Sequence, residues 1–167
     1  MNELEETRAT ELLEAQSKAE RLFNEIDARS LIRPGVTEKT VNADIYALAK
    51  EMYGITTYWH KRIVRAGKNT LLPYAENPPD LMIETDDILF LDLGPVFEHW
   101  EADFGRTFVL GSDPLKHKMK QDVEQHLPRA SSISTKLRRS PAMSFSITPH
   151  RWLRSSDGSL VGALRDI

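Results

Sequence analysis

Two aspartates, Asp92 and Asp103, are the residues whose type and spacing could perform chemistry. Asp92 lies within the apolar run ILFLDLG, residues 88–94, and Asp103 begins a second strand-like run, residues 103–110. A carboxylate between large aliphatic side chains is expected to be partly buried, and an unpaired buried charge costs several kcal/mol. Asp92 therefore requires a partner, and the chain reverses between the two runs.

The partner that the hairpin predicts is the second aspartate. If Phe97 and Glu98 form the tip, Asp92 faces Asp103 directly, and opposed residues share one face with Cβ atoms about 4.5–5.5 Å apart. Two like charges would repel there, and a divalent cation bound by both carboxylates removes the conflict. A three-residue loop would instead shift the register by one residue and turn one aspartate to solvent.

Helices at both ends of the hairpin region are predicted to position it. Residues 3–29 have apolar side chains at steps of three and four, which predicts an amphipathic helix. Thr37 is a suitable N-cap for a second helix, which Gly54 ends. Residues 56–64 are rich in β-branched and aromatic side chains and predict a strand. A third helix is predicted to begin at Pro114, because proline is favoured at the first position of a helix. Helices and an antiparallel hairpin in this order favour an α+β fold.

Length and composition exclude several classes of protein. The 167 residues are 40% hydrophobic and 28% charged with a net charge of -3, which indicates one soluble domain without a basic field for nucleic acid. No apolar run approaches the roughly 20 residues that span a membrane. The N-terminal sequence MNELEETRATELL is too acidic for a secretory signal, and there are no cysteines. We therefore expect a cytoplasmic protein without nucleic-acid or membrane partners.

The residues around the aspartates resemble the pita-bread metallopeptidases: methionine aminopeptidase, Xaa-Pro aminopeptidase, prolidase and creatinase. The shared pattern is Asp-Leu-Gly at 92–94 and Asp-Phe-Gly-Arg-Thr at 103–107, with the two aspartates eleven residues apart. The stretch WHKRIV, residues 59–64, resembles the Xaa-Pro branch. The resemblance covers about residues 5–125 and implies the front half of a pita-bread fold, in which helices pack on an antiparallel sheet.

The same resemblance implies an activity and a set of site residues. Relatives hydrolyse the N-terminal peptide bond of a peptide, in the Xaa-Pro branch before proline, with a hydroxide held between two divalent ions (Mn, Co, Fe or Zn). Their first aspartate chelates one ion and their second bridges both, roles that we expect for Asp92 and Asp103. Many relatives have a substrate-binding His at the position of Tyr74, whose phenol can donate a hydrogen bond. His99, at the predicted tip, is a second substrate-binding candidate, whereas His60 is interpreted as a strand-surface residue.

Three of the five metal ligands of the family are absent. The family adds one His and two Glu downstream, but His126 and His150 lack the Gly-His-x-x-Gly setting and no Glu follows Glu124. We therefore expect no catalysis by this chain. The alternative is a catalytically dead member that serves as a binding or dimerisation module, with a second copy as partner.

Composition divides the chain into residues 1–125, a partial metallopeptidase domain, and residues 126–167. The second segment holds seven of the 22 Lys+Arg, two of the 25 Asp+Glu and nine serines. Codons displaced by two bases over residues 158–167 permit Glu-Phe-Gly-Gly-Arg-Ile-Ala-Gly-His, a family-like approach to the third metal ligand. We therefore expect residues 126–167 to be disordered or to derive from a shifted reading frame.

Overall fold

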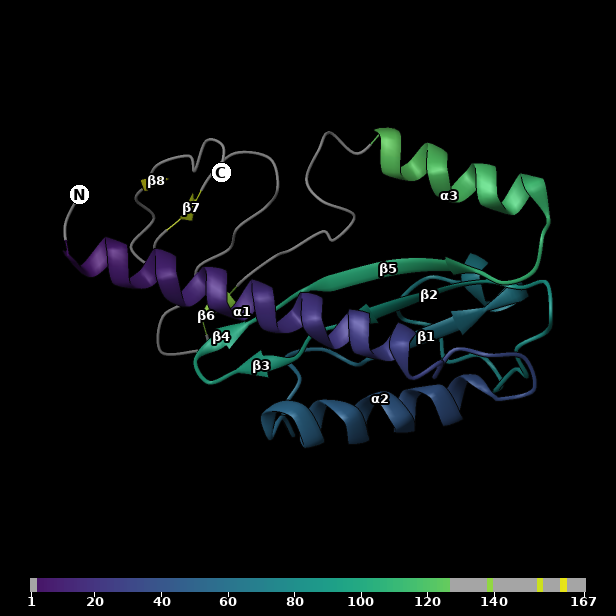
Figure 1. Cartoon of the computed structure of the whole chain (residues 1–167), viewed down its shortest axis with the longest axis horizontal. Coiled ribbons are helices and arrows are strands. Elements are labelled where there is room, and N and C mark those ends of the chain that lie inside the picture. Colours follow the sequence, from purple (N-terminus) through teal and green to yellow (C-terminus); the bar gives the residue numbers. More distant parts are fainter. Residues whose placement is uncertain (1–2, 127–137, 140–152, 155–159, 162–167) are drawn as a thin grey trace.

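An antiparallel sheet with helices packed on it forms the described part of the chain, in agreement with the predicted α+β class. The computed structural model describes residues 3–126, 138–139, 153–154 and 160–161 (Figure 1). The helices are α1 (Glu3–Ala28), α2 (Glu38–Tyr53), the short 3-10 helix η1 (Gly67–Leu71) and α3 (Pro114–His126). The strands are β1 (Ile63–Ala66), β2 (Ile88–Leu93), β3 (Val96–Phe97), β4 (Trp100–Glu101), β5 (Phe104–Val109), β6 (Arg138–Arg139), β7 (Leu153–Arg154) and β8 (Leu160–Val161).

The central strand of the main sheet is β2, which pairs antiparallel with β1 on one side and β5 on the other. Asp92 therefore lies between Ile63 of β1 and Gly105 of β5. Beyond Asp92 the β2–β5 hairpin continues as a narrow ribbon, in which β3 pairs with β4 and β4 pairs with β6. Strands β7 and β8 pair with each other.

The hairpin register differs from the predicted one by two residues. Phe97 pairs with Trp100, so the turn consists of Glu98 and His99 rather than Phe97 and Glu98. Glu98 adopts a left-handed φ of 56°, which a tight turn requires. Asp92 lies opposite Gly105 rather than opposite Asp103. Because side chains alternate faces with a period of two, the shift of two residues leaves both aspartates on one face.

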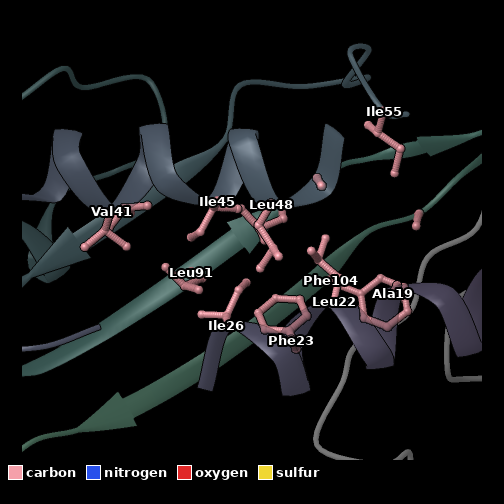
Figure 2. Packing of buried hydrophobic residues seen from close by; sticks show 14 of the residues in the cluster. Ala19, Leu22, Phe23, Ile26, Val41, Ile45, Leu48, Ile55, Leu91 and Phe104 are labelled. Atoms are coloured by element: carbon pink, nitrogen blue, oxygen red, sulfur yellow. The ribbon is translucent and has the colours of Figure 1, made fainter. Parts of the chain in front are cut away.

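Alternation along β2 separates the core from the face that carries Asp92. Leu89, Leu91 and Leu93 are fully buried, whereas the residues between them are half-buried. The leucines contact the apolar faces of α1 and α2, and Figure 2 shows Leu91 of β2 between Ile45 of α2 and Ile26 of α1. The core therefore fixes which way Asp92 points.

The predicted ends of the first two helices are confirmed within one or two residues. α1 ends at Ala28, one residue before the predicted end. At the start of α2 the hydroxyl of Thr37 accepts a hydrogen bond from the Thr40 backbone N–H at 3.2 Å. Gly54 ends α2 with a left-handed φ of 68°. In α3, Pro114 is the first helical residue, as predicted.

The predicted strand at residues 56–64 is wrong for most of its length. Only its last two residues belong to β1, which begins at Ile63. The preceding residues meet the hairpin at an isolated bridge between Tyr58 and Pro95, where the Trp59 N–H donates to the Gly94 carbonyl at 2.9 Å and the Val96 N–H donates to the Thr57 carbonyl at 3.1 Å. β2 ends at Leu93, so these residues have no continuous strand to pair with.

Two further expectations concern the chain as a whole. The boundary at residue 125 falls in the last turn of α3, whereas the expected disorder or frame shift of residues 126–167 lies almost entirely outside the described residues. Within the described residues, no helix is both long enough and apolar enough to cross a membrane.

Candidate metal centre

Three side chains that could bind a metal converge at the end of β2: His60, Asp92 and Asp103. One ligand atom from each lies within 4.8 Å of the other two. The His60 Nε2 atom is 3.7 Å from Asp92 Oδ1 and 3.8 Å from Asp103 Oδ1. The side chain of His60 is 9% exposed, and those of the aspartates are 35% and 28% exposed. The site is thus partly covered but open on one side.

Backbone contacts of neighbouring residues position the second aspartate. Asp103 directly precedes β5, and the residue before it is held from two sides. The Ala102 N–H donates to the Pro95 carbonyl at 2.9 Å, and the Trp59 indole N–H donates to the Ala102 carbonyl at 2.8 Å. The Trp59 bond joins the segment that carries His60 to the segment that carries Asp103.

The pKa values of the cluster reflect burial and the proximity of like and unlike charges. Burial raises the pKa of Asp92, the charge of Asp103 raises it further, and His60 partly opposes both effects. Burial lowers the pKa of His60, but the carboxylates of Asp103 and Asp92 and the Lys61 carbonyl together raise it above its usual value. The pair of acids therefore attracts positive charge.

The donor set and the room around it fit a divalent cation. Two carboxylate oxygens and one imidazole nitrogen suit Zn, Fe, Co or Mn. Metal–ligand bonds of about 2.0–2.2 Å separate ligand atoms by about 3–4.4 Å, a range that includes the distances from His60 Nε2 to the two carboxylates. Gly94 provides space, since a Cβ there would lie 2.6 Å from His60 Nε2 and 2.8 Å from the Trp59 indole nitrogen.

We expect Gly94→Ala to displace His60 and to lower the free energy of unfolding by about 1–3 kcal/mol, because an added methyl group must push the rings aside. Urea denaturation and the NMR shifts of the His60 ring measure both effects. Gly105→Ala is the matched control, since a Cβ there meets only the Leu91 carbonyl, at an ordinary 3.6 Å. Equal stability of the two variants would contradict the expectation.

The predicted substrate-binding residue Tyr74 lies beside the cluster, on the loop after η1. Its ring centroid is 6.2 Å from that of His60, and its side chain is exposed. Its hydroxyl accepts a hydrogen bond from the Lys61 backbone N–H at 3.3 Å, and the Lys61 ammonium lies 4.6 Å above its ring. Tyr74 thus stands at the rim of the cluster, with its side chain open to solvent.

Cationic side chains and one amide hold this loop through its backbone carbonyls. Arg65, which is buried, donates to the carbonyls of Leu72 and Glu76. The Lys61 ammonium donates to the same Glu76 carbonyl at 3.2 Å. The Asn69 amide donates to the Pro79 carbonyl at 3.0 Å. Tyr74 is therefore carried by a segment that is fixed on both sides.

The two histidines interpreted from the sequence, His99 and His60, have different outcomes. His99 lies on the exposed β3–β4 turn, outside the cluster of His60 and the two aspartates. The interpretation of His60 as a strand-surface residue is wrong: His60 is nine-tenths buried and precedes β1. The antiparallel return of β1 along β2 could have revealed this, because residues before Ile63 must lie beside residues after Asp92.

Fold and site together define a metallopeptidase-like domain, and comparison with known proteins identifies its family. The model of metallopeptidase family M24 matches residues 10–152, and the chain belongs to this family. The match continues past residue 125 into the compositionally different segment.

Relatives of this chain include Xaa-Pro dipeptidases and proteins of the same fold. It is 33% identical over 87 residues to the Xaa-Pro dipeptidase of Pyrococcus horikoshii, covering 52% of this chain and 24% of the relative. It is 27% identical over 105 residues to the Xaa-Pro dipeptidase of Lactobacillus helveticus, and the match covers 63% of this chain and 28% of the relative. The crystal structure of the X-Pro aminopeptidase from Thermotoga maritima matches with a TM-score of 0.60 at 24% identity. This match covers 72% of this chain and 33% of the aminopeptidase chain. The chain thus spans about a quarter to a third of the length of these proteins, and the front half of the pita-bread fold is confirmed.

Proposed function

We propose that Asp92 and Asp103 hold a divalent cation in a site built to hydrolyse the N-terminal peptide bond of a peptide, in the manner of an Xaa-Pro peptidase. The observation that carries the proposal is the convergence of the two carboxylates with His60 within 4.8 Å. Membership of metallopeptidase family M24 supports the reaction class, and the Xaa-Pro dipeptidases among the relatives support the substrate class.

Two aspartates of this chain would bind the cation, and Tyr74 would orient the peptide. A bound cation would supply Lewis acidity toward the scissile carbonyl and lower the pKa of a coordinated water. Asp92 and Asp103 would hold the cation by carboxylate oxygens. Tyr74, exposed beside the site, would donate its phenol proton to a carbonyl of the peptide.

We expect Mn²⁺ or Co²⁺ to stabilise the 167-residue protein against unfolding. A ligand that binds only the folded state at 100 times its Kd adds about 2.7 kcal/mol, and this gain should vanish with EDTA. Asp92→Asn and Asp103→Asn should each abolish the gain, because one carboxylate cannot hold the ion alone. Thermal unfolding with and without metal measures it.

Asp122→Asn is the control for this experiment. Asp122 is an exposed carboxylate on α3 that pairs with Lys118 at 2.7 Å, so its loss should leave the metal effect unchanged. Absence of any metal effect in the unmodified protein would contradict the proposal. Self-association retained without metal binding would instead favour a binding or dimerisation module.

We further expect the 167-residue chain not to hydrolyse an Xaa-Pro dipeptide or tripeptide, even with added Mn²⁺ or Co²⁺. The family resemblance implies five metal ligands, of which this chain matches Asp92 and Asp103, too few to hold two ions. Chromatographic detection of the released N-terminal residue is the measurement. Turnover that is abolished both by a chelator and by Asp103→Ala would prove the expectation wrong.

A further inference from the structure

We propose that His60 is a direct ligand of the cation and coordinates it through Nε2, in addition to the two aspartates. The inference rests on the proposed metal function of Asp92 and Asp103 and adds to it a nitrogen ligand from the segment before β1. Three observations carry it: the orientation of the ring, its confinement, and the distances from Nε2 to the carboxylates.

The orientation of the ring leaves the correct nitrogen available. His60 Nδ1 lies 2.7 Å from the carbonyl oxygen of Lys61. A carbonyl oxygen can only accept, so Nδ1 carries the proton, and in the neutral ring Nε2 presents its lone pair. Histidine ligands of metals commonly donate their second N–H to a backbone carbonyl or a carboxylate, which fixes the ring in this way.

Confinement keeps Nε2 directed at the carboxylates. The His60 side chain is only 9% exposed, and the Trp59 ring packs edge-on against it with centroids 4.4 Å apart. Gly94 lies against the ring, where a Cβ would overlap its Cδ2 and Nε2 atoms. A solvated histidine would not require such close packing, and the ring has little room to turn away from the acids.

The distances fit shared coordination better than hydrogen bonding. Nε2 is 3.7 Å and 3.8 Å from the nearest oxygens of Asp92 and Asp103, beyond the 2.7–3.2 Å range of an N–H···O bond. Nε2 is nearly equidistant from the two oxygens, as expected of atoms around one ion. The competing account is that an imidazolium neutralises the two acids and that His60 never binds metal.

Zinc titration followed by NMR of the ¹⁵N-histidine-labelled 167-residue protein separates the two accounts. We expect the Nε2 resonance of one histidine to shift on addition of Zn²⁺, and we expect this signal to be absent in His60→Gln. Calorimetry should show that His60→Ala weakens Zn²⁺ binding by about 100-fold or more, since loss of a residue that merely supports a ligand already costs about 10- to 100-fold. His117→Ala, on the exposed part of α3, should bind Zn²⁺ as the unmodified protein does.

A rescue experiment protects the conclusion against misfolding of a variant. His60→Gly should regain Zn²⁺ binding with added imidazole, because free imidazole can occupy the space that the ring leaves. Zinc binding that requires Asp92 but produces no Nε2 shift, or that is unchanged in His60→Ala, would overturn this inference while the proposed function stands. Failure of the unmodified protein to bind Zn²⁺, Mn²⁺ or Co²⁺ would overturn both.

Discussion

Phe23→Ala is expected to lower the free energy of unfolding by about 3–5 kcal/mol, as measured by urea denaturation. Phe23 is 1% exposed on α1, and its ring centroid lies 6.2 Å from that of Phe104 at the start of β5 (Figure 2). The Arg106 guanidinium lies 4.9 Å from the same ring and would lose this contact. The substitution leaves a cavity between α1 and the strand that follows Asp103.

Leu13→Ala on the same helix is the control for this prediction. Leu13 is 55% exposed, so its loss should change stability by no more than about 0.5 kcal/mol. A similar small effect for Phe23→Ala would mean that α1 does not pack on the sheet as described.

Glu38→Ala is expected to destabilise the protein by about 3 kcal/mol. The Glu38 side chain is 6% exposed and accepts hydrogen bonds from the Ala66 backbone N–H at 2.6 Å and from the Asn69 amide at 2.9 Å. Its removal leaves two buried donors short of a partner, one at the end of β1 and one in η1, and each costs about 1–3 kcal/mol. Guanidinium denaturation of the purified variant measures the loss.

Two variants test whether hydrogen bonds rather than volume explain the Glu38 effect. Glu38→Gln keeps an oxygen for the Ala66 N–H but brings an NH₂ group against the amide of Asn69, so an intermediate loss is expected. Lys39→Ala changes an exposed neighbour and should be nearly neutral. If Glu38→Gln were as stable as the unmodified protein, the bond to Asn69 would contribute nothing.

The helices and the face of the aspartate pair were predictable because local patterns determine them. The ends of α2 follow from the side-chain chemistry of Thr37 and the backbone freedom of Gly54. The face of Asp92 follows from strict alternation with buried leucines along β2. That the two aspartates hold a metal stays a prediction, as does the origin of residues 126–167.

The hairpin register and the environment of His60 were not predicted, because each depends on which side chains the folded chain buries. The turn consists of Glu98 and His99, one residue later than predicted. It lies there because Phe97 pairs with Trp100, and both of these side chains are buried. The β-branched residues before β1 have a strand-like composition, but β2 ends before they can pair with it. The burial of His60 then depends on the absence of a side chain at Gly94, which no local pattern reveals.

The loop that carries Tyr74 is held mainly through its backbone carbonyls, so its attachment depends little on which side chains it carries. Arg65, Lys61 and Asn69 bind carbonyl oxygens, and every residue type in a chain has one. Leu71 at the end of η1 is 85% exposed, and Tyr74, which is 51% exposed, adds the hydrogen bond that its hydroxyl accepts from the Lys61 backbone N–H at 3.3 Å. Mutation can therefore replace the groups beside the site without disturbing the support beneath them. The loop is a natural starting point for libraries that vary the side chains beside the site.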